Sequence, residues 1–184
     1  MNLTNHFLIA MPTLNDPNFK RTVTYLCSHN NQGAMGIVLN RPLDMSLGEM
    51  LEQMDIDACD PKTTSIQVIH GGPVLPERGF VLHRPAGEWD AMFNIEGTKL
   101  AIATSRDILR AMANGDGPEE AVVALGYAGW GAGQLERELN DNVWLSGPAD
   151  ERIIFELPYE ERWEGAARLL GVRVERLSAQ VGHA

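Results

Sequence analysis

Short apolar and β-branched runs alternate with turn residues along the chain, a pattern typical of β-strands. The polar residues 30–33 separate two such runs, and Pro42 stops the second, so this region is predicted to form a hairpin. Residues 118–125 also suit a helix start, because Pro118 is followed by two glutamates, but we favour a buried strand there. The predicted strands cover residues 7–10, 21–27, 34–39, 65–70, 79–83, 99–103, 118–125, 143–145 and 152–155.

Helical signals are fewer. Ser46 followed by Glu49 has the form of a capping box, which predicts a helix starting there. After Pro158, apolar residues recur at i, i+3, i+4 and i+7, and Gly171 is expected to end that helix. The predicted helices cover residues 46–54, 104–114, 134–139 and 158–170.

The order of these elements indicates the fold class. Several strands follow one another directly and the helices are spaced irregularly, so a repeating βα unit does not describe the chain. A mixed α/β fold fits better. With 184 residues, no internal repeat and no long linker, the chain is expected to form a single domain over residues 1–184.

Composition and charge limit the classes of function that the chain can have. The chain is 44% hydrophobic and 22% charged, as expected for a globular protein whose core needs neither disulfides nor a structural metal. Its 15 basic and 25 acidic residues give a net charge of −10, the wrong sign for neutralising phosphates. Direct nucleic-acid binding is therefore not expected, because it would require a local basic patch on an acidic chain.

The sequence shows neither a targeting segment nor a membrane span. Residues 1–11 lack a basic region followed by an apolar one, and no apolar run approaches the roughly 18 residues that cross a bilayer. We therefore expect a cytoplasmic protein without membrane contact. There Cys27 and Cys59 are expected to be reduced thiols rather than a disulfide.

Residues 43–61 contain six acids and no lysine or arginine. This run predicts an acidic surface. A solvated helix and loop explains it more simply than a dedicated binding patch does.

A glycine cluster follows the predicted strand 118–125 and precedes a predicted helix, a position where backbone N–H groups can hold a phosphate. Its spacing matches neither common phosphate-binding motif, and no lysine lies near. The alternative is a tight strand-to-helix turn beneath Tyr127 and Trp130. The cluster consists of Gly126, Gly129, Gly131 and Gly133.

Thr104, Ser105 and Arg106 stand at a predicted helix start, where two hydroxyls and a guanidinium could bind an anion. Helix capping alone explains the hydroxyls. We therefore keep both interpretations.

Single polar residues at predicted turns are further candidates. Arg41, beside Asn40, and Arg78 could each hold an anion, or form an ion pair with one of the many acids. Gln134 and Glu136 could act as polar ligands or acid/base groups, or lie on a helix surface.

A nucleophile or metal site is not evident. Cys27 and His29 are two residues apart on a predicted strand and so face the same side, but a buried cysteine beside a hydrogen-bonded histidine explains them as well. No serine occupies a nucleophile motif. The histidines show no ligand spacing, so we expect no metal and no cofactor.

Several longer motifs resemble the AlgH/YqgE family of bacterial proteins over nearly the whole chain. They are residues 7–12 (FLIAMP), 16–23 (DPNFKRTV), 33–36 (GAMG), 40–42 (NRP), 71–74 (GGPV), 78–83 (RGFVLH), 104–107 (TSRD) and 126–136 (GYAGWGAGQLE), with Trp144 and the closing residues 182–184. The resemblance implies a single-domain mixed α/β fold in which a small bifurcated or barrel-like sheet is surrounded by helices. It brings no established catalytic residue, cofactor or DNA contact, and most of the family is uncharacterised.

Two functional hypotheses remain. The family name comes from a proposed role in transcriptional regulation, and the absence of a catalytic motif favours a non-enzymatic regulatory or interaction protein acting through a protein partner. The alternative is an enzyme or small-anion-binding protein. Its cleft would bring together Arg41, Arg78, Ser105, Arg106 and Gln134, with Tyr127 or Trp130 as an apolar wall.

Overall fold

The computed structural model describes residues 1–85 and 87–179. The strands are β1 (His6–Ala10), β2 (Val23–Asn30), β3 (Gly33–Val38), β4 (Pro42–Ser46), β5 (Gln67–His70), β6 (Val74–Arg84), β7 (Met92–Asn94), β8 (Ala101–Ala103), β9 (Glu120–Gly131) and β10 (Trp144–Pro148). The helices are α1 (Leu47–Gln53), α2 (Pro61–Thr64), α3 (Arg106–Ala113), α4 (Gln134–Asn140), α5 (Glu151–Phe155), α6 (Arg162–Leu169) and α7 (Val174–Ala179), with a 3₁₀ turn at Tyr159–Glu161. The closing residues 182–184 of the family motif lie outside the described residues.

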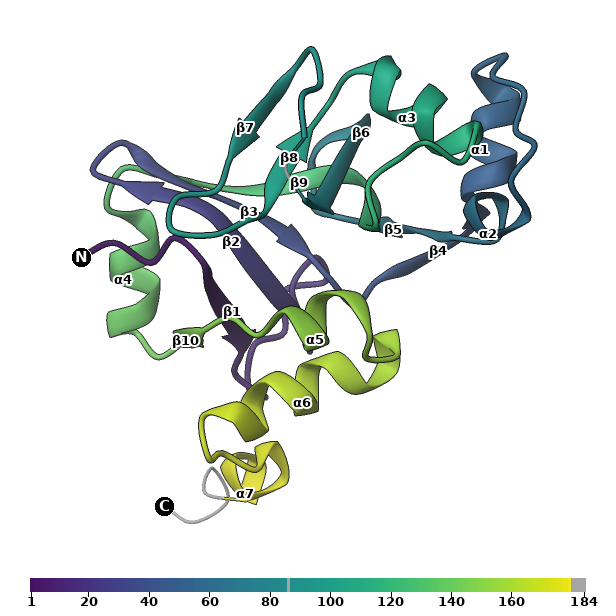
Figure 1. The fold of residues 1–184 in the computed structure, drawn as a ribbon. Helices are drawn as coiled ribbons and strands as arrows, with labels where there is room; N and C mark the ends of the chain where they lie inside the picture. Colours follow the sequence, from purple (N-terminus) through teal and green to yellow (C-terminus); the bar gives the residue numbers. More distant parts are fainter. Residues whose placement is uncertain (86, 180–184) are drawn as a thin grey trace.

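One ten-stranded sheet runs in the order β10-β1-β2-β3-β9-β6-β8-β7, and β5 joins β4 to β9. The sheet curls into a half-barrel (Figure 1). All pairs are antiparallel except β5 with β9. This mixed α/β architecture with a bifurcated, barrel-like sheet confirms the fold expected from the sequence.

The bifurcation occurs along β9. Its last residues pair with β3, whereas its first half pairs with β6 on one side and with β5 on the other. Between the two halves, Gly126 has φ +76°, and a Cβ there would lie 2.3 Å from the carbonyl oxygen of Gly72. Glycine is therefore required at this crossing because any side chain would collide with the facing backbone.

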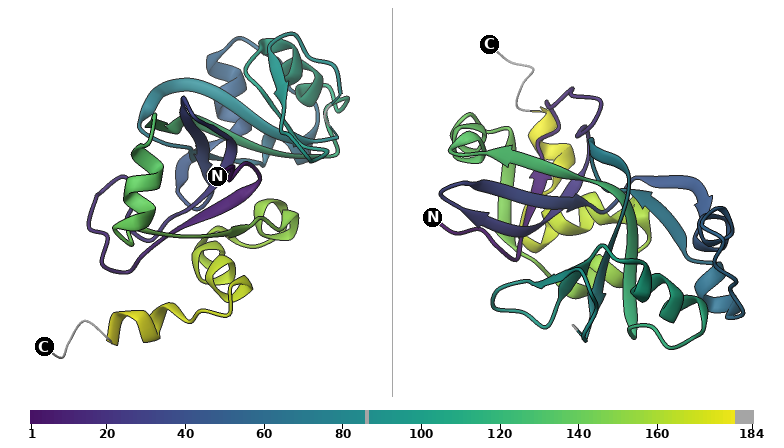
Figure 2. Two further views of the ribbon diagram at one scale, coloured as in Figure 1. Left: turned by 90° about the vertical axis from the view of Figure 1, so that its left-hand side faces the viewer. Right: turned by 90° about the horizontal axis from the view of Figure 1, so that it is seen from above.

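Three groups of buried side chains hold the layers together. The largest joins the inner face of the sheet to α5 and α6, the second lies beneath α1 and α3, and the third surrounds Trp130, Trp144 and Leu135 beside α4. Figure 2 shows that α1 to α3 and the pair α5–α6 lie apart on the curled sheet. In residues 1–85 and 87–179, no helix has the length and apolar character needed to cross a membrane.

Local helix signals were reliable. Ser46 caps α1, and Glu49 completes the capping box by accepting from the Ser46 backbone N–H. These bonds from Ser46 lower the pKa of Glu49. The predicted end of α6 is confirmed as well, because Gly171 follows the helix with φ +71°.

One local prediction was wrong, and a second was right only in part. Residues 152–155 form helix α5 rather than a strand, because the side chain of Asp150 accepts from the backbone N–H of Arg152 and caps a helix. Most of the glycine cluster, which was expected to form a strand-to-helix turn, is part of a strand. It continues β9 to Gly131, and the chain turns only at Gly133, whose φ is +70°.

Candidate functional site

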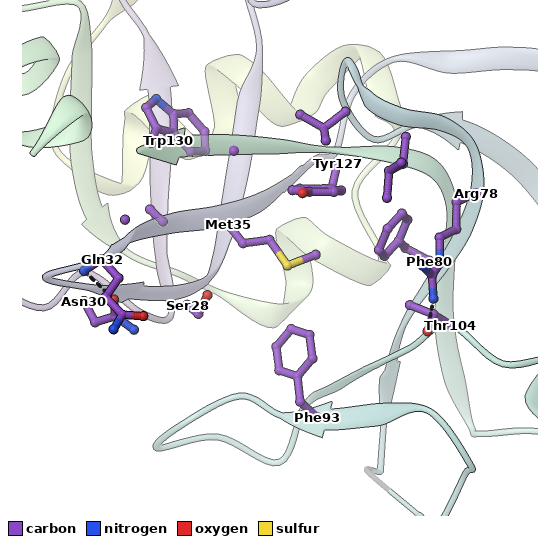
Figure 3. Close-up of a pocket in the computed structure, with 15 residues that line it drawn as sticks. Ser28, Asn30, Gln32, Met35, Arg78, Phe80, Phe93, Thr104, Tyr127 and Trp130 are labelled. Atoms are coloured by element: carbon purple, nitrogen blue, oxygen red, sulfur yellow. Dashed lines mark hydrogen bonds between the residues drawn. The ribbon is translucent and has the colours of Figure 1, made fainter. Parts of the chain in front are cut away.

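An open hollow of about 680 Å³, called here the groove, lies between β7 and the strands β2, β3, β6 and β9 (Figure 3). Its apolar lining comes from Met35, Val74, Leu75, Phe80, Phe93 and Tyr127, and its polar lining includes Ser28, Asn30, Gln32, Arg78 and Thr104. These residues come from segments far apart in sequence. The groove therefore exists only because the sheet curls.

Aromatic and sulfur-containing side chains form the middle of the groove. The rings of Phe80 and Tyr127 pack edge to face with centroids 5.4 Å apart. Met35 and Phe93 point toward the same space from opposite sides (Figure 3). Phe93 is 38% exposed and Leu75 51% exposed, although both are large apolar residues. A shared exposed apolar surface of this kind is typical of a binding site.

Arg78 marks one end of the groove and is the one charged residue among the described residues that line it. Its guanidinium donates a hydrogen bond to Oγ1 of Thr104 at 3.3 Å. Within the described residues, Arg78 is exposed and forms no ion pair. A guanidinium carries five N–H donors, so most of those of Arg78 are open to a ligand.

Asn40 and Arg41 lie outside the groove and hold the segment that precedes β2. The amide of Asn40 accepts from the Val23 backbone N–H at 3.0 Å and donates to the Arg21 carbonyl at 2.8 Å. The guanidinium of Arg41 donates to the carbonyls of Pro17 and Lys20. Both predicted ligand residues thus have clear structural roles.

Ser105 and Arg106 are also engaged by the fold and do not line the groove. Ser105 is the N-cap residue of α3, but its hydroxyl donates to the carboxylate of Asp107 instead of capping the helix. Although burial opposes ionisation of Asp107, the hydrogen bonds from Ser105 and from backbone amides outweigh it and lower the pKa. Arg106 donates to the Met54 carbonyl at 2.6 Å and so ties α3 to the end of α1.

Trp130 and Gln134 belong to a cluster around Glu138, called here the Glu138 cluster. The indole N–H groups of Trp130 and Trp144 donate to one carboxylate oxygen of Glu138 at 2.9 and 2.8 Å. The Gln134 amide donates to the other oxygen at 2.9 Å and accepts from the Gly131 backbone N–H. Trp130 borders the groove, but its indole N–H is engaged in this cluster rather than free for a ligand.

Cys27 and His29 do not form a reactive pair. Burial raises the pKa of the Cys27 thiol, which keeps it protonated, and the thiol faces the Tyr25 carbonyl at 3.7 Å. Nδ1 of His29 accepts from the Leu3 backbone N–H at 3.0 Å, so Nε2 carries the proton and donates to Glu136. This neutral histidine fixes the N-terminal segment. In the described part of the chain, no group of three or more potential ligand side chains could hold a metal ion.

The acidic run forms an exposed surface at the end of α1, as predicted. Glu49, Glu52, Asp55 and Asp57 line a second hollow of about 800 Å³ there. Its lining lacks the large exposed apolar side chains that distinguish the groove.

Comparison with known proteins places the chain in a family. A family model described as DUF179, AlgH-like, matches residues 7–175. A UPF0301 protein of Thioalkalivibrio sulfidiphilus is 57% identical over 184 residues, covering 100% of this chain and 97% of the relative. A UPF0301 protein of Nitrosococcus oceani is 53% identical over 180 residues, covering 98% and 96%.

Two solved structures share the fold. The solution structure of the AlgH protein from Pseudomonas aeruginosa is 53% identical, with a TM-score of 0.81, and the match covers 100% of this chain and 97% of that one. A crystal structure of protein DIP2367 from Corynebacterium diphtheriae has a TM-score of 0.71 at 19% identity, covering 96% and 91%, which supports the fold alone.

The fold and the groove thus define a mixed α/β protein with a curled half-barrel sheet that opens onto an apolar surface. The chain belongs to the AlgH-like family, whose relatives matched here carry names that state no activity.

Sequence reasoning named Tyr127 or Trp130 as an apolar wall but missed the rest of the apolar lining of the groove. Met35, Phe80 and Phe93 stand in separate segments, and nothing in their local pattern sets them apart from core residues. Of the residues expected to bind a ligand, the structure brings Arg78, Thr104, Tyr127 and Trp130 to the groove.

Proposed function

We propose that this protein is a non-enzymatic cytoplasmic interaction protein that binds a partner protein through the groove. The observation that carries the proposal is the exposure of Phe93 and Leu75 on the same hollow surface as the unpaired Arg78. Burial of such apolar side chains in a partner stabilises a complex, while a single charge orients it. An influence on transcription would then be indirect and would act through the bound partner.

The distribution of charge supports a protein partner over duplex DNA. The chain carries a net charge of −10, and two of its candidate arginines, Arg41 and Arg106, donate to backbone carbonyls of their own chain. Binding to a duplex depends on several free basic side chains that meet phosphates together. Arg78 alone does not supply that.

A small anionic ligand is the second candidate function. It is favoured by one observation: the exposed Arg78 guanidinium lies next to the Thr104 hydroxyl, and no carboxylate of the described residues pairs with it. Arg41, Ser105, Arg106 and Gln134 take no part in this smaller site, since none of them lines the groove. A phosphate or carboxylate of a metabolite would meet one guanidinium and one hydroxyl there.

Affinity capture from bacterial lysate with matched variants tests the proposed function. Phe93→Ser removes an exposed apolar side chain inside the groove, and Leu169→Ser removes one outside it that is 45% exposed. We expect proteins retained by the wild type and by Leu169→Ser to be lost from Phe93→Ser. Equal retention by all three forms would contradict a partner site in the groove.

A thermal-shift screen against phosphorylated and carboxylated metabolites separates the two candidates. A ligand at about 100 times its dissociation constant adds about 2.7 kcal/mol to the free energy of unfolding. A stabilisation that Arg78→Ala abolishes and Phe93→Ser preserves would favour the small-anion function. We expect no such stabilisation.

A further inference from the structure

We infer how the partner is recognised, an inference that rests on the proposed function: an extended segment of the partner adds as a new strand to the free edge of β7 and places a carboxylate against Arg78. Three features of the groove support this mode. They are an unpaired strand edge, an apolar surface beside it and a single positive charge at its end.

β7 ends the strand order of the sheet and pairs only with β8 among the described strands. Ala91 and Ile95 flank β7 and bond toward β8. The Ala91 carbonyl accepts from the Thr104 backbone N–H, and the Ile95 backbone N–H donates to the Leu100 carbonyl. Hydrogen-bonding direction alternates along an antiparallel strand. Met92 and Asn94 therefore turn their backbone N–H and C=O groups outward.

Such an edge is a template for another strand, and proteins use it to bind extended peptides. Ala91, Phe93 and Asn94 are exposed, so the edge is not covered by other described residues at these positions. β7 has three residues, which limits the pairing to a segment of roughly four to six residues. A segment this short suits a peptide better than a second folded domain.

The side chains beside the edge favour apolar residues at every second position of the partner. Phe93 lies between Met92 and Asn94 and points into the groove, where Figure 3 shows it facing Met35. Successive side chains of an added strand alternate between the two faces of the sheet. Those on the groove side would lie beside Phe93, and the others would lie on the opposite face of the sheet, on the side of Met92.

Arg78 determines the preferred charge. It donates to Thr104, whose backbone N–H is bonded to the Ala91 carbonyl, so its guanidinium lies in the groove near the N-terminal end of β7, on the side of β8. Among the residues that the structure describes, no other charged side chain lines the groove. An aspartate, a glutamate or a terminal carboxylate at the matching end of the partner segment would form a charge-assisted hydrogen bond there. A basic residue at that position would be repelled.

Selection from a phage-displayed library of random linear peptides, with the full chain as bait, provides the probe. The most enriched peptide is then synthesised and its affinity measured by calorimetry. We expect alternating apolar positions with an acidic residue at one end. We also expect Arg78→Gln to weaken binding by about tenfold, which corresponds to about 1.4 kcal/mol.

A matched pair of variants tests strand addition itself. Asn94→Pro removes an outward N–H without removing a bond to β8, and proline is tolerated at such edge positions. Asn94→Ala removes only the side chain. We expect the proline variant to bind at least about tenfold more weakly and the alanine variant to bind within about twofold of the wild type.

N-methylation of the peptide gives a readout that does not depend on the folding of any variant. Methylation of alternate backbone nitrogens should abolish binding in one register and leave it nearly unchanged in the other. Equal effects in both registers would overturn strand addition. The groove would still be a partner site if Phe93→Ser abolished binding of the same peptide.

Two other results would also overturn the inference. If no selected peptide depends on Phe93, the proposed function fails together with this mode of recognition. If sedimentation shows a dimer of the chain that Asn94→Pro dissociates, the occupant of the edge is a second copy of this chain rather than a partner peptide.

Discussion

Two ends of one glycine-rich stretch of β9 serve different purposes. Near its end, Trp130 packs among Phe19 and Trp144, with ring centroids 6.0 Å from each, and its indole N–H reaches Glu138. Three residues earlier, Tyr127 packs on Phe80 and borders the open groove. The strand therefore separates a closed cluster from an exposed surface.

The difference lies in how the polar groups are satisfied. In the Glu138 cluster, two indole N–H groups and one amide share a single carboxylate, which leaves both indole donors partnered. In the groove, Arg78 uses one described hydrogen bond and retains open donors beside exposed apolar rings. A satisfied cluster stabilises the fold, whereas unused donors next to apolar surface are available to a partner.

The largest effect is expected from Glu138→Ala. This change leaves the indole N–H groups of Trp130 and Trp144 without their acceptor, at a cost of about 1–3 kcal/mol for each buried donor. We expect the free energy of unfolding to fall by about 2–6 kcal/mol for the two donors together, measured by urea unfolding. Glu138→Gln keeps an acceptor oxygen and should lose clearly less. Equal losses in both variants would show that the shared carboxylate is not the stabilising feature.

A smaller contrast is expected between two predicted ligand residues. Asn40→Ala removes two hydrogen bonds to backbone groups and should lower the free energy of unfolding by about 1–3 kcal/mol. Arg78→Ala removes one bond of an exposed side chain and should change it by less than about 0.5 kcal/mol. Chemical unfolding of both variants measures the contrast. A larger loss in Arg78→Ala would assign Arg78 to the fold instead of the groove.

Much of the fold was readable from local sequence. The capping box at Ser46, the hairpin at residues 30–33 and the stop at Gly171 are local signals, and the structure contains all three. The strand predicted over residues 152–155 was wrong because the apolar run there was given more weight than the helix cap at Asp150. The three residues of β7 are too few to show an alternating pattern of apolar and polar positions, so the sequence did not predict this edge strand of the sheet.

The site was harder to predict because the candidate arginines have similar sequence surroundings. Arg41, Arg78 and Arg106 all stand near turns, and only tertiary contacts show that two of them bind carbonyls of their own chain. Trp130 and Tyr127 share one motif and both border the groove, yet only the packing of β9 shows that the Trp130 indole N–H is bound by Glu138 and that the Tyr127 ring packs on Phe80. Curling of the sheet is a long-range property that local patterns do not contain.

A weaker, pH-dependent effect is expected from His83, because its buried polar atoms are not all hydrogen-bonded as the indole donors of the Glu138 cluster are. His83 is fully buried and its Nδ1 donates to the Pro85 carbonyl at 3.0 Å, whereas its Nε2 is buried and has no hydrogen-bond partner among the described residues. Burial lowers the pKa of His83 because a charged imidazole would lose its hydration, although the bond to Pro85 opposes this. The folded protein therefore resists protonation at this site.

The sign of the effect follows from proton linkage. Below the unfolded pKa of about 6.5, the unfolded chain takes up a proton that folded His83 excludes, so stability is lost as the pH falls from there toward the lowered folded pKa. We expect wild-type protein to lose more unfolding free energy between about pH 7.5 and about pH 5.5 than His83→Gln does. Identical pH profiles in the two proteins would show that His83 does not contribute.

Mapping the selected peptide onto the protein by amide and indole chemical shifts in solution compares the two regions of β9 directly. We predict that added peptide shifts the backbone amides of Met92, Phe93 and Asn94 and those around Phe80 and Tyr127. The indole signals of Trp130 and Trp144, held by Glu138, should stay in place. Shifts centred on those indoles or on the acidic surface of α1, with β7 unchanged, would contradict the groove as the binding face.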